Sequence, residues 1–223
     1  MHRVALRAEI VERVVARRGR LHLYDELDAK RTALLVIDMQ NAFVAAGAPI
    51  EVPAAREIVP QINRLAAELR RRGVPVIWVL HRNEAGGADW PHFFEVFVRP
   101  ENRERAAQAL SPGNDLQRLW RGVEVAPSDI QVAKNRYSAF LGTGSLKRTL
   151  DERGIDTLLI AGTKTNVCCE CTARDAMMLD YKVVLLSDCT AALSDEEHRA
   201  TLENVIQQFG DVLTADEALR LLK

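Results

Sequence analysis

Short apolar runs that alternate with helix-like stretches constrain this 223-residue chain more than any other feature. Such runs predict buried strands, and the stretches between them carry apolar residues at helical spacing. Strands are predicted at residues 32–38, 74–80, 130–134, 157–161 and 182–186, with a possible short strand at 211–213. Helices are predicted at 52–72, 145–153, 167–179 and 194–209, and another begins at 214–217. This alternation predicts an α/β fold, a three-layer α/β/α sandwich on a mainly parallel sheet.

The first 30 residues lie outside this alternation. Residues 4–19 have apolar side chains at helical spacing and predict an amphipathic helix. We therefore expect an N-terminal helical extension over residues 1–30 and one larger domain over 31–223. The helix could pack on its own domain or reach across to another subunit.

Composition excludes several classes of protein. The formal net charge of -1 removes any global electrostatic argument for binding nucleic acid or an anionic membrane. The apolar runs are too short to span a bilayer, and the N-terminus mixes Arg with Glu, unlike a signal peptide. Four cysteines without an export signal predict free thiols and a cytoplasmic protein.

Three reactive side chains lie at the carboxyl ends of predicted strands. Asp38 ends the first, Lys134 ends the third, and Cys168 follows the fourth. Ligands bind at these ends in open parallel sheets, so the fold should bring the three to one edge. Because Cys168 also sits where a helix begins, the helix dipole should lower its pKa and favour the thiolate.

These residues permit nucleophilic hydrolysis of an amide or ureide. A thiolate attacks the carbonyl, Asp38 takes the thiol proton, and Lys134 stabilises the charges. The backbone N–H groups of Lys164 and Cys168 are candidate donors to the oxyanion. Loss of ammonia or an amine leaves a thioester-type acyl-enzyme, which water hydrolyses. We expect a small-molecule substrate and no cofactor.

Three segments resemble the isochorismatase-like cysteine hydrolases. They are residues 32–43 (TALLVIDMQNAF), 134–140 (KNRYSAF) and 165–176 (TNVCCECTARDA). The resemblance implies the isochorismatase-like (Rossmann-like) hydrolase fold and an Asp38–Lys134–Cys168 triad. It also implies a cis peptide between Thr163 and Lys164 and a homo-oligomer, a dimer or tetramer. Within the family the chain is most similar to ureidoacrylate and biuret hydrolases and to N-carbamoylsarcosine amidase.

The chain departs from the family pattern at three places. Lys164 stands where a small or apolar residue is usual, Cys171 stands where Ser is common, and the N-terminal helix is an extension. A cation at Lys164 could favour an acidic substrate or could point to solvent.

Residues 81–129 form the least regular part of the chain and predict a lid or pocket wall. We expect substrate contacts from four residues: Phe43, His81, Arg136 and Tyr137. The loop phenylalanines Phe93, Phe94 and Phe97 are expected to pack the loop or a subunit contact. Nicotinamidases of the same superfamily hold a metal with an aspartate and histidines after the second strand. The spacing of His81, Asp89 and His92 does not match that cluster, so we expect no metal.

Two other functions remain open from the sequence. Cys168 and Cys171 form a C-x-x-C at a helix start, as in dithiol redox proteins. A redox function would leave the Asp38 and Lys134 segments unexplained. A non-catalytic family member is the second alternative. Cys169, Cys171 and Cys189 are expected to pack rather than react.

Overall fold

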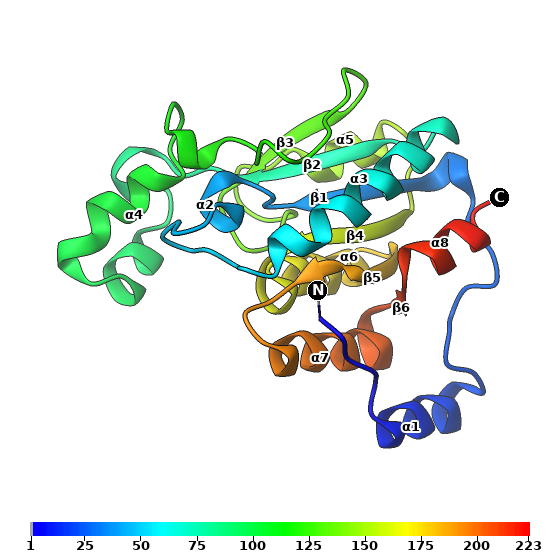
Figure 1. Ribbon diagram of the computed structural model, residues 1–223. Coiled ribbons are helices and arrows are strands. Elements are labelled where there is room, and N and C mark those ends of the chain that lie inside the picture. The colour runs from blue at the N-terminus through cyan, green and yellow to red at the C-terminus, as the bar shows by residue number, and fades with distance from the viewer. Residues whose placement is uncertain (1) are drawn as a thin grey trace.

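The computed structural model describes residues 2–223, and its centre is a six-stranded sheet in the order β3-β2-β1-β4-β5-β6 (Figure 1). Every pair of neighbouring strands is parallel. The strands are β1 (Thr32–Ile37), β2 (Val76–His81), β3 (Ile130–Lys134), β4 (Thr157–Thr163), β5 (Lys182–Ala191) and β6 (Asp211–Leu213). The predicted α/β class and parallel sheet are confirmed, including the short sixth strand.

Helices cover both faces of the sheet and make it the middle of three layers. The first layer contains α2 (Asn41–Val44), α3 (Ala55–Arg71) and α8 (Ala215–Leu221), whose apolar residues share one core cluster. The second contains α5 (Leu146–Asp151), α6 (Glu170–Met178) and α7 (Asp195–Asn204), which pack in the other cluster. Because both faces are covered, β1 is buried along its whole length, which explains its continuous apolar run.

Two strands extend by two or more residues beyond their predicted ends. β4 continues to Thr163 and β5 to Ala191, because the register shifts between Ile160 and Gly162 and the strands then pair again. Gly162 has φ of 111°, and a Cβ there would lie 2.0 Å from the Ile37 carbonyl oxygen. Only glycine allows β4 to approach β1 this closely just before Asp38.

The N-terminal helix packs on its own chain. α1 (Ala8–Arg18) begins later than predicted and buries Ile10 and Val14. Figure 1 places it beside α7 and away from the sheet. The Arg7 guanidinium donates to both carboxylate oxygens of Glu203, the shortest distance being 2.6 Å. This bidentate pair attaches the segment before α1 to the end of α7.

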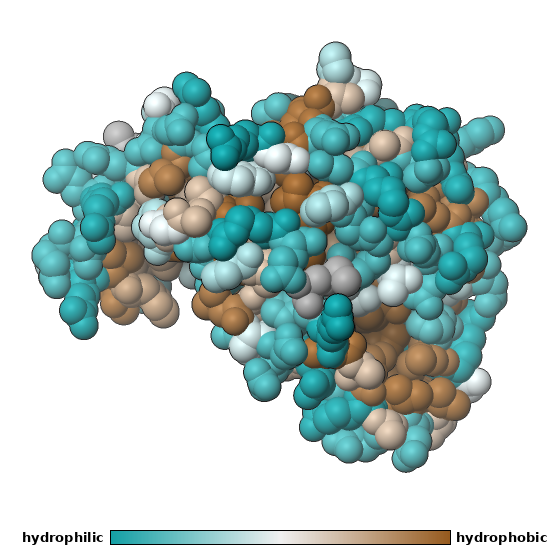
Figure 2. All heavy atoms as spheres, in the orientation of Figure 1, coloured by the Kyte–Doolittle hydropathy of each residue, from teal (hydrophilic) through white to brown (hydrophobic). Residues whose placement is uncertain are grey.

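The β2–β3 connection, residues 82–129, projects from the carboxyl end of the sheet at the left of Figure 1. It is more regular than predicted. It contains α4 (Arg103–Ala109), a π-helical turn (Phe93–Phe97) and short 3₁₀ turns at Ala85–Gly87, Pro100–Asn102 and Asp115–Gln117. Its projecting part carries hydrophobic surface (Figure 2). Val96 and Phe97 are exposed residues of this connection. Across residues 2–223, none of the helices has the length and apolar character needed to cross a membrane.

Candidate active site

Three side chains from separate strand ends converge at the carboxyl edge of the sheet. The Lys134 Nζ lies 2.9 Å from Asp38 Oδ2 and 3.5 Å from Cys168 Sγ. Asp38 and Lys134 are 0% exposed, and Cys168 is 4% exposed. The structure thus brings together the three residues that the sequence singles out, although β2 separates the strands that carry Asp38 and Lys134.

The backbone at Asp38 is itself unusual. Its φ of 54° lies in the left-handed region, which non-glycine residues rarely adopt. The Asp38 N–H donates to the Val79 carbonyl at 2.8 Å, so the turn is anchored on β2. Strained backbone of this kind clusters at functional sites.

Lys134 is held by two further acceptors. Its Nζ lies 3.2 Å from His81 Nδ1 and 3.1 Å from the Arg136 carbonyl oxygen. Because an ammonium only donates, His81 Nδ1 must accept, and the proton of the neutral ring is on Nε2. That nitrogen lies 3.0 Å from Asn83 Oδ1. Burial, and then the Lys134 charge, lower the pKa of His81 well below its usual value, which agrees with a neutral ring.

His81 is in turn fixed through its backbone. Gln40, two residues after Asp38, accepts from the His81 N–H at 2.8 Å and donates to the His81 carbonyl at 2.9 Å. It also donates to the Gln117 carbonyl at 2.6 Å. Gln40 therefore joins the end of β1 to the end of β2 and to the β2–β3 connection.

The charge states differ from the sequence-based expectation at Cys168. Burial, and next the Asp38 carboxylate, raise the pKa of the Cys168 thiol, so the resting thiol is protonated. The predicted resting thiolate is wrong, because burial outweighs the helix dipole. Burial raises the pKa of Asp38. Burial alone would lower the pKa of Lys134, but Asp38 and Cys168 more than offset it, so the pKa is raised and the ammonium persists.

The turn that carries Cys168 is the π-helical segment Thr165–Cys169, between β4 and α6. The preceding Thr163–Lys164 peptide is cis. The Lys164 carbonyl accepts from the N–H groups of Val167 at 3.2 Å and Cys169 at 3.1 Å. Within residues 2–223 the Lys164 N–H has no hydrogen-bond partner. Thr172 donates its hydroxyl to the Cys168 carbonyl at 2.7 Å, which ties the turn to α6.

A cavity of about 370 Å³ opens onto Cys168. Four residues were predicted to contact the substrate. Of these, Phe43, His81 and Tyr137 line the cavity, and Arg136 does not. The Arg136 guanidinium instead lies 4.9 Å from the centroid of the Trp90 ring. The remaining lining residues are mostly apolar: Pro49, Ile50, Asn83, Trp90, Phe93, Phe94, Val98, Asn102, Arg105, Ala106, Ala109, Leu110, Lys164, Val167 and Cys168.

The β2–β3 connection supplies most residues that sequence reasoning missed. Phe93 and Phe94 pack against each other within the connection, as expected, and they also line the cavity. Phe97 alone of the three points outward, at 72% exposure. Trp90 stacks on Phe93 with ring centroids 4.9 Å apart and contacts Tyr137 edge-on at the same distance. The aromatic content of this segment was the available signal.

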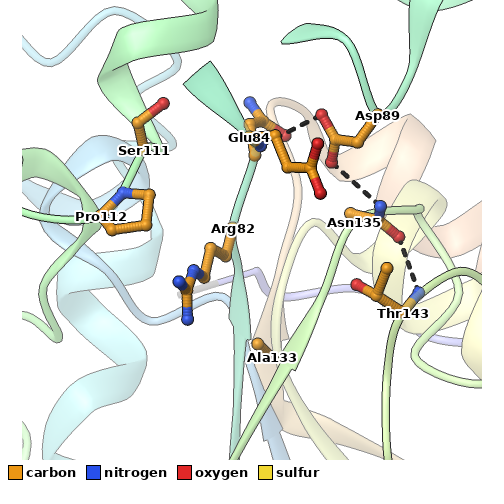
Figure 3. A pocket seen from close by; sticks show the side chains of 9 residues that line it. Arg82, Glu84, Asp89, Ser111, Pro112, Ala133, Asn135 and Thr143 are labelled. Atoms are coloured by element: carbon orange, nitrogen blue, oxygen red, sulfur yellow. Dashed lines mark hydrogen bonds between the residues drawn. The ribbon is translucent and has the colours of Figure 1, made fainter.

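The residues considered for a metal site are dispersed. A second hollow of about 630 Å³ is shown in Figure 3. Asn83 lines both this hollow and the cavity at Cys168. In it Asp89 accepts from the Asn135 amide at 2.9 Å and from the Glu84 N–H at 3.1 Å. His81 instead faces Lys134. No group of three His, Cys, Asp or Glu side chains within residues 2–223 is placed to hold a metal ion.

The cysteines within residues 2–223 are free thiols. Cys169 and Cys189 are buried, and Cys171 is half-buried. The all-parallel sheet and the Asp38–Lys134 pair at Cys168 favour a nucleophile over a dithiol redox pair.

Comparison with known proteins agrees with this arrangement. The family model described as the isochorismatase domain matches residues 32–217. The chain belongs to the isochorismatase family. Its matched region begins at β1 and contains all three converging residues.

Relatives within the isochorismatase family carry different names. A probable inactive nicotinamidase from Arabidopsis thaliana is 36% identical over 78% of this chain and 87% of its own length. The ureidoacrylate amidohydrolase RutB from Methylobacterium radiotolerans is 34% identical over 86% of this chain and 81% of its own. The crystal structure of a cysteine hydrolase from Pseudomonas syringae pv. phaseolicola has a TM-score of 0.82 and 29% identity, covering 90% of this chain and 95% of that one.

Proposed function

We propose that this isochorismatase-family protein is a cysteine amidohydrolase that cleaves a C–N bond in a small amide or ureide. The observation that carries the proposal is the convergence of Asp38 and Lys134 on Cys168 at the floor of a cavity. A buried carboxylate beside a protonated thiol suits general-base activation of the nucleophile. The relatives named as amidohydrolase and cysteine hydrolase support this reaction class.

The first half-reaction transfers the acyl group to sulfur. As Cys168 Sγ attacks the carbonyl carbon, Asp38 accepts the thiol proton. Its carboxylate is fully buried, and Oδ2 lies 2.9 Å from the Lys134 Nζ. When the C–N bond breaks, Asp38 returns the proton to the leaving nitrogen, and ammonia or an amine departs. A thioester to Cys168 remains.

The second half-reaction regenerates the thiol. Asp38 removes a proton from water as the water oxygen attacks the thioester carbonyl, and the C–S bond breaks. The sulfur leaves as thiolate and takes the proton from Asp38. Throughout the reaction the positive charge of Lys134 lies beside Asp38 and Cys168. This charge limits the cost of moving negative charge between the carboxylate and the sulfur.

Other residues position the substrate in this proposal. The backbone N–H groups of Lys164 and Cys168 donate to the oxyanion. Phe43 and Tyr137 contact the substrate, and His81 orients Lys134 from the cavity wall. Arg136 acts through Trp90, on whose ring it lies, rather than through direct contact.

The remaining expectations belong to the same proposal. We propose an N-terminal extension over residues 1–30, a hydrolase domain over 31–223, and a homo-oligomer in the cytoplasm, with no nucleic-acid or membrane partner. Exposed Val96 and Phe97 on the β2–β3 connection support a subunit contact. The free thiols support a reducing compartment.

An ammonia-release screen over ureides, carbamoyl amino acids, nicotinamide and maleamate tests the reaction. Intact-mass detection of an acyl adduct covers substrates with a larger leaving group. Cys168→Ala should abolish turnover and adduct, whereas Cys171→Ser should retain both. Loss of activity in both variants, together with dithiol-dependent disulfide reduction, would instead support the redox function.

A second candidate function is a non-catalytic family member. One relative is named a probable inactive nicotinamidase, and that name favours this candidate. Tight binding of an amide with no ammonia and no adduct in the same screen would support this candidate.

A further inference from the structure

The turn that carries Cys168 is held from outside the cavity by a histidine of α7. His198 is 1% exposed, and its Nδ1 lies 2.9 Å from the Thr165 hydroxyl oxygen. Thr165 is the first residue of the π-helical turn and is fully buried. Within residues 2–223 its hydroxyl has no other hydrogen-bond partner. Because a buried hydroxyl without a partner is costly, this bond fixes the start of the turn.

The bond acts on the stretch of backbone that the proposed reaction uses. Thr165 lies between Lys164 and Cys168, whose N–H groups are the proposed oxyanion donors. The same turn sets the position of the Cys168 sulfur relative to the Lys134 ammonium, 3.5 Å away. Stabilisation of an oxyanion and attack by a nucleophile both require fixed geometry. A change at Thr165 should therefore affect the chemical step.

A second histidine covers the first. The His2 ring stacks on the His198 ring, with centroids 4.4 Å apart and an angle of 18° between the planes. The Ala192 N–H donates to His2 Nε2 at 3.0 Å, and His2 Nδ1 lies 2.6 Å from Asp195 Oδ1. Because Nε2 accepts, the ring proton is on Nδ1 and is donated to Asp195. These two bonds fix the His2 ring over His198, and its side chain is only 6% exposed.

His2 belongs to a segment that precedes the region matched by the isochorismatase model, residues 32–217. In Figure 1 the segment before α1 runs along α7. His2 contacts Asp195 at the start of this helix, and Arg7 pairs with Glu203 near its end. The segment is thus attached to α7 at two places, and α7 presents His198 to the Cys168 turn.

The contact of His2 with Ala192 lies near the same turn. Ala192 follows β5, and Ala191 at the end of β5 pairs with Thr163 at the end of β4. Burial, and next the nearby His2, lower the pKa of His198 to about 4, so the His198 ring is neutral near pH 7. A neutral ring keeps an acceptor nitrogen, which a doubly protonated ring lacks.

We propose that His198 is a positioning residue for the Cys168 turn and that His2 holds the His198 ring against Thr165. Within the described residues, neither histidine lines the cavity at Cys168, so both act on kcat rather than on substrate binding. This inference rests on the proposed function for its kinetic readout, but alkylation of Cys168 tests it without turnover.

The bond between His198 and Thr165 can be removed from either side. His198→Phe keeps an aromatic ring beneath His2, and Thr165→Val keeps the shape of the side chain without the hydroxyl. Each should lower kcat roughly 10-fold and change KM by less than about twofold, as expected when one hydrogen bond that positions the reacting groups is lost. The double variant should be no slower than His198→Phe, because both changes remove the same bond. His198→Asn, whose amide can reach the Thr165 hydroxyl, should restore most of kcat.

The role of His2 is tested in the full chain. His2→Ala should lower kcat about threefold and should have no further effect in a His198→Phe background, since the bond that it supports is then absent. His22→Ala is the matched control, because His22 lies in the same N-terminal segment but contacts Asp211 at 2.9 Å. It should leave kcat unchanged. An equal loss of kcat in His22→Ala would overturn the role of His2.

Alkylation of Cys168 by iodoacetamide gives a readout that needs no substrate. The rate is followed by intact mass and peptide mapping in a Cys171→Ser background. His198→Phe and Thr165→Val should slow it, because Asp38 then acts on a displaced thiol. If no amide is hydrolysed, slower alkylation in both variants supports the positioning role and removes the proposed function alone. Unchanged alkylation in both variants would overturn the positioning role.

Three kinetic results would also overturn the proposal. The first is a kcat in Thr165→Val within about twofold of wild type. The second is a loss in the double variant equal to the product of the two single losses, which would show that the residues act independently. The third is a His198→Asn variant that is folded by urea unfolding but no faster than His198→Phe, since that would show a structural role alone. Thr165→Val carries the test if His198→Phe does not fold.

Discussion

Two regions meet at Cys168, and they are built in opposite ways. Below the sulfur, Asp38 and Lys134 sit at strand ends, fully buried and in direct contact. Above it, the β2–β3 connection covers the cavity with aromatic and half-exposed side chains and also carries the exposed Phe97. The lower region depends on a few short polar contacts in a packed interior, whereas the upper region depends on apolar contact. The first suits chemistry that needs fixed geometry, and the second suits selection among substrates.

The largest expected effect follows from breaking the ion pair below Cys168. Lys134→Met should leave the Asp38 carboxylate buried without a counter-charge, which costs about 3–5 kcal/mol of stability. Activity should fall below detection, because Asp38 would then be protonated and unable to act as base. Urea unfolding and kcat/KM measure the two effects. Lys147→Ala, which breaks the exposed pair with Asp151, is the control and should change neither. Retained activity in Lys134→Met would contradict the role of the pair.

A smaller effect is expected from Asp38→Asn. The amide keeps the shape of the carboxylate but cannot accept the thiol proton, so kcat should fall by roughly 10²–10⁴. KM should change little, since Asp38 does not line the cavity wall. Steady-state kinetics with a substrate from the screen tests this. A kcat within threefold of wild type, about 0.7 kcal/mol in the barrier, would show that another group acts as base.

The pH profile distinguishes a protonated resting thiol from a resting thiolate. Burial raises the pKa of Asp38 above its ordinary 3.8, so kcat/KM should fall as pH decreases through that raised value. No rise is expected near pH 9, the ordinary thiol pKa, because burial raises the pKa of Cys168. Steady-state kinetics from about pH 4 to about pH 11 would measure both the fall in kcat/KM at low pH and the absence of a rise at alkaline pH. A transition near pH 6.5 that disappears in His81→Asn would show that His81 titrates, contrary to its lowered pKa.

The smallest effects are expected in the upper region. Trp90→Ala removes a wall that stacks on Phe93, so KM should rise about 10-fold while stability changes by less than about 2 kcal/mol. Leu141→Ser, at a residue that is 54% exposed and outside the cavity, is the control and should leave KM unchanged and stability within about 0.5 kcal/mol. Kinetics, urea unfolding and solution mass are the measurements. A large loss of stability or of mass in Phe97→Ser would place Phe97 in a subunit contact.

The same contrast explains what could be predicted from the sequence. The strands, their parallel arrangement and the meeting of Asp38, Lys134 and Cys168 follow from local apolar runs and from the rule that strand ends share one edge. The contacts of the β2–β3 connection did not follow, because Phe93, Phe94 and Arg105 take their positions from long-range packing. The bond from Gln40 to the Gln117 carbonyl, 77 residues away, is one example of such packing.

The sequence by itself determined the fold class and the three reactive groups, since periodicity and residue type are local properties. Only the tertiary structure decided their protonation. The helix start at Cys168 predicts a lowered thiol pKa, but the assembled core buries the sulfur beside a carboxylate, and the pKa rises. The tertiary structure also placed the Lys134 ammonium against the His81 ring and placed Arg105 in the cavity wall. Desolvation and cavity shape depend on every element packed around a group, so neither can be inferred from its neighbours in the chain.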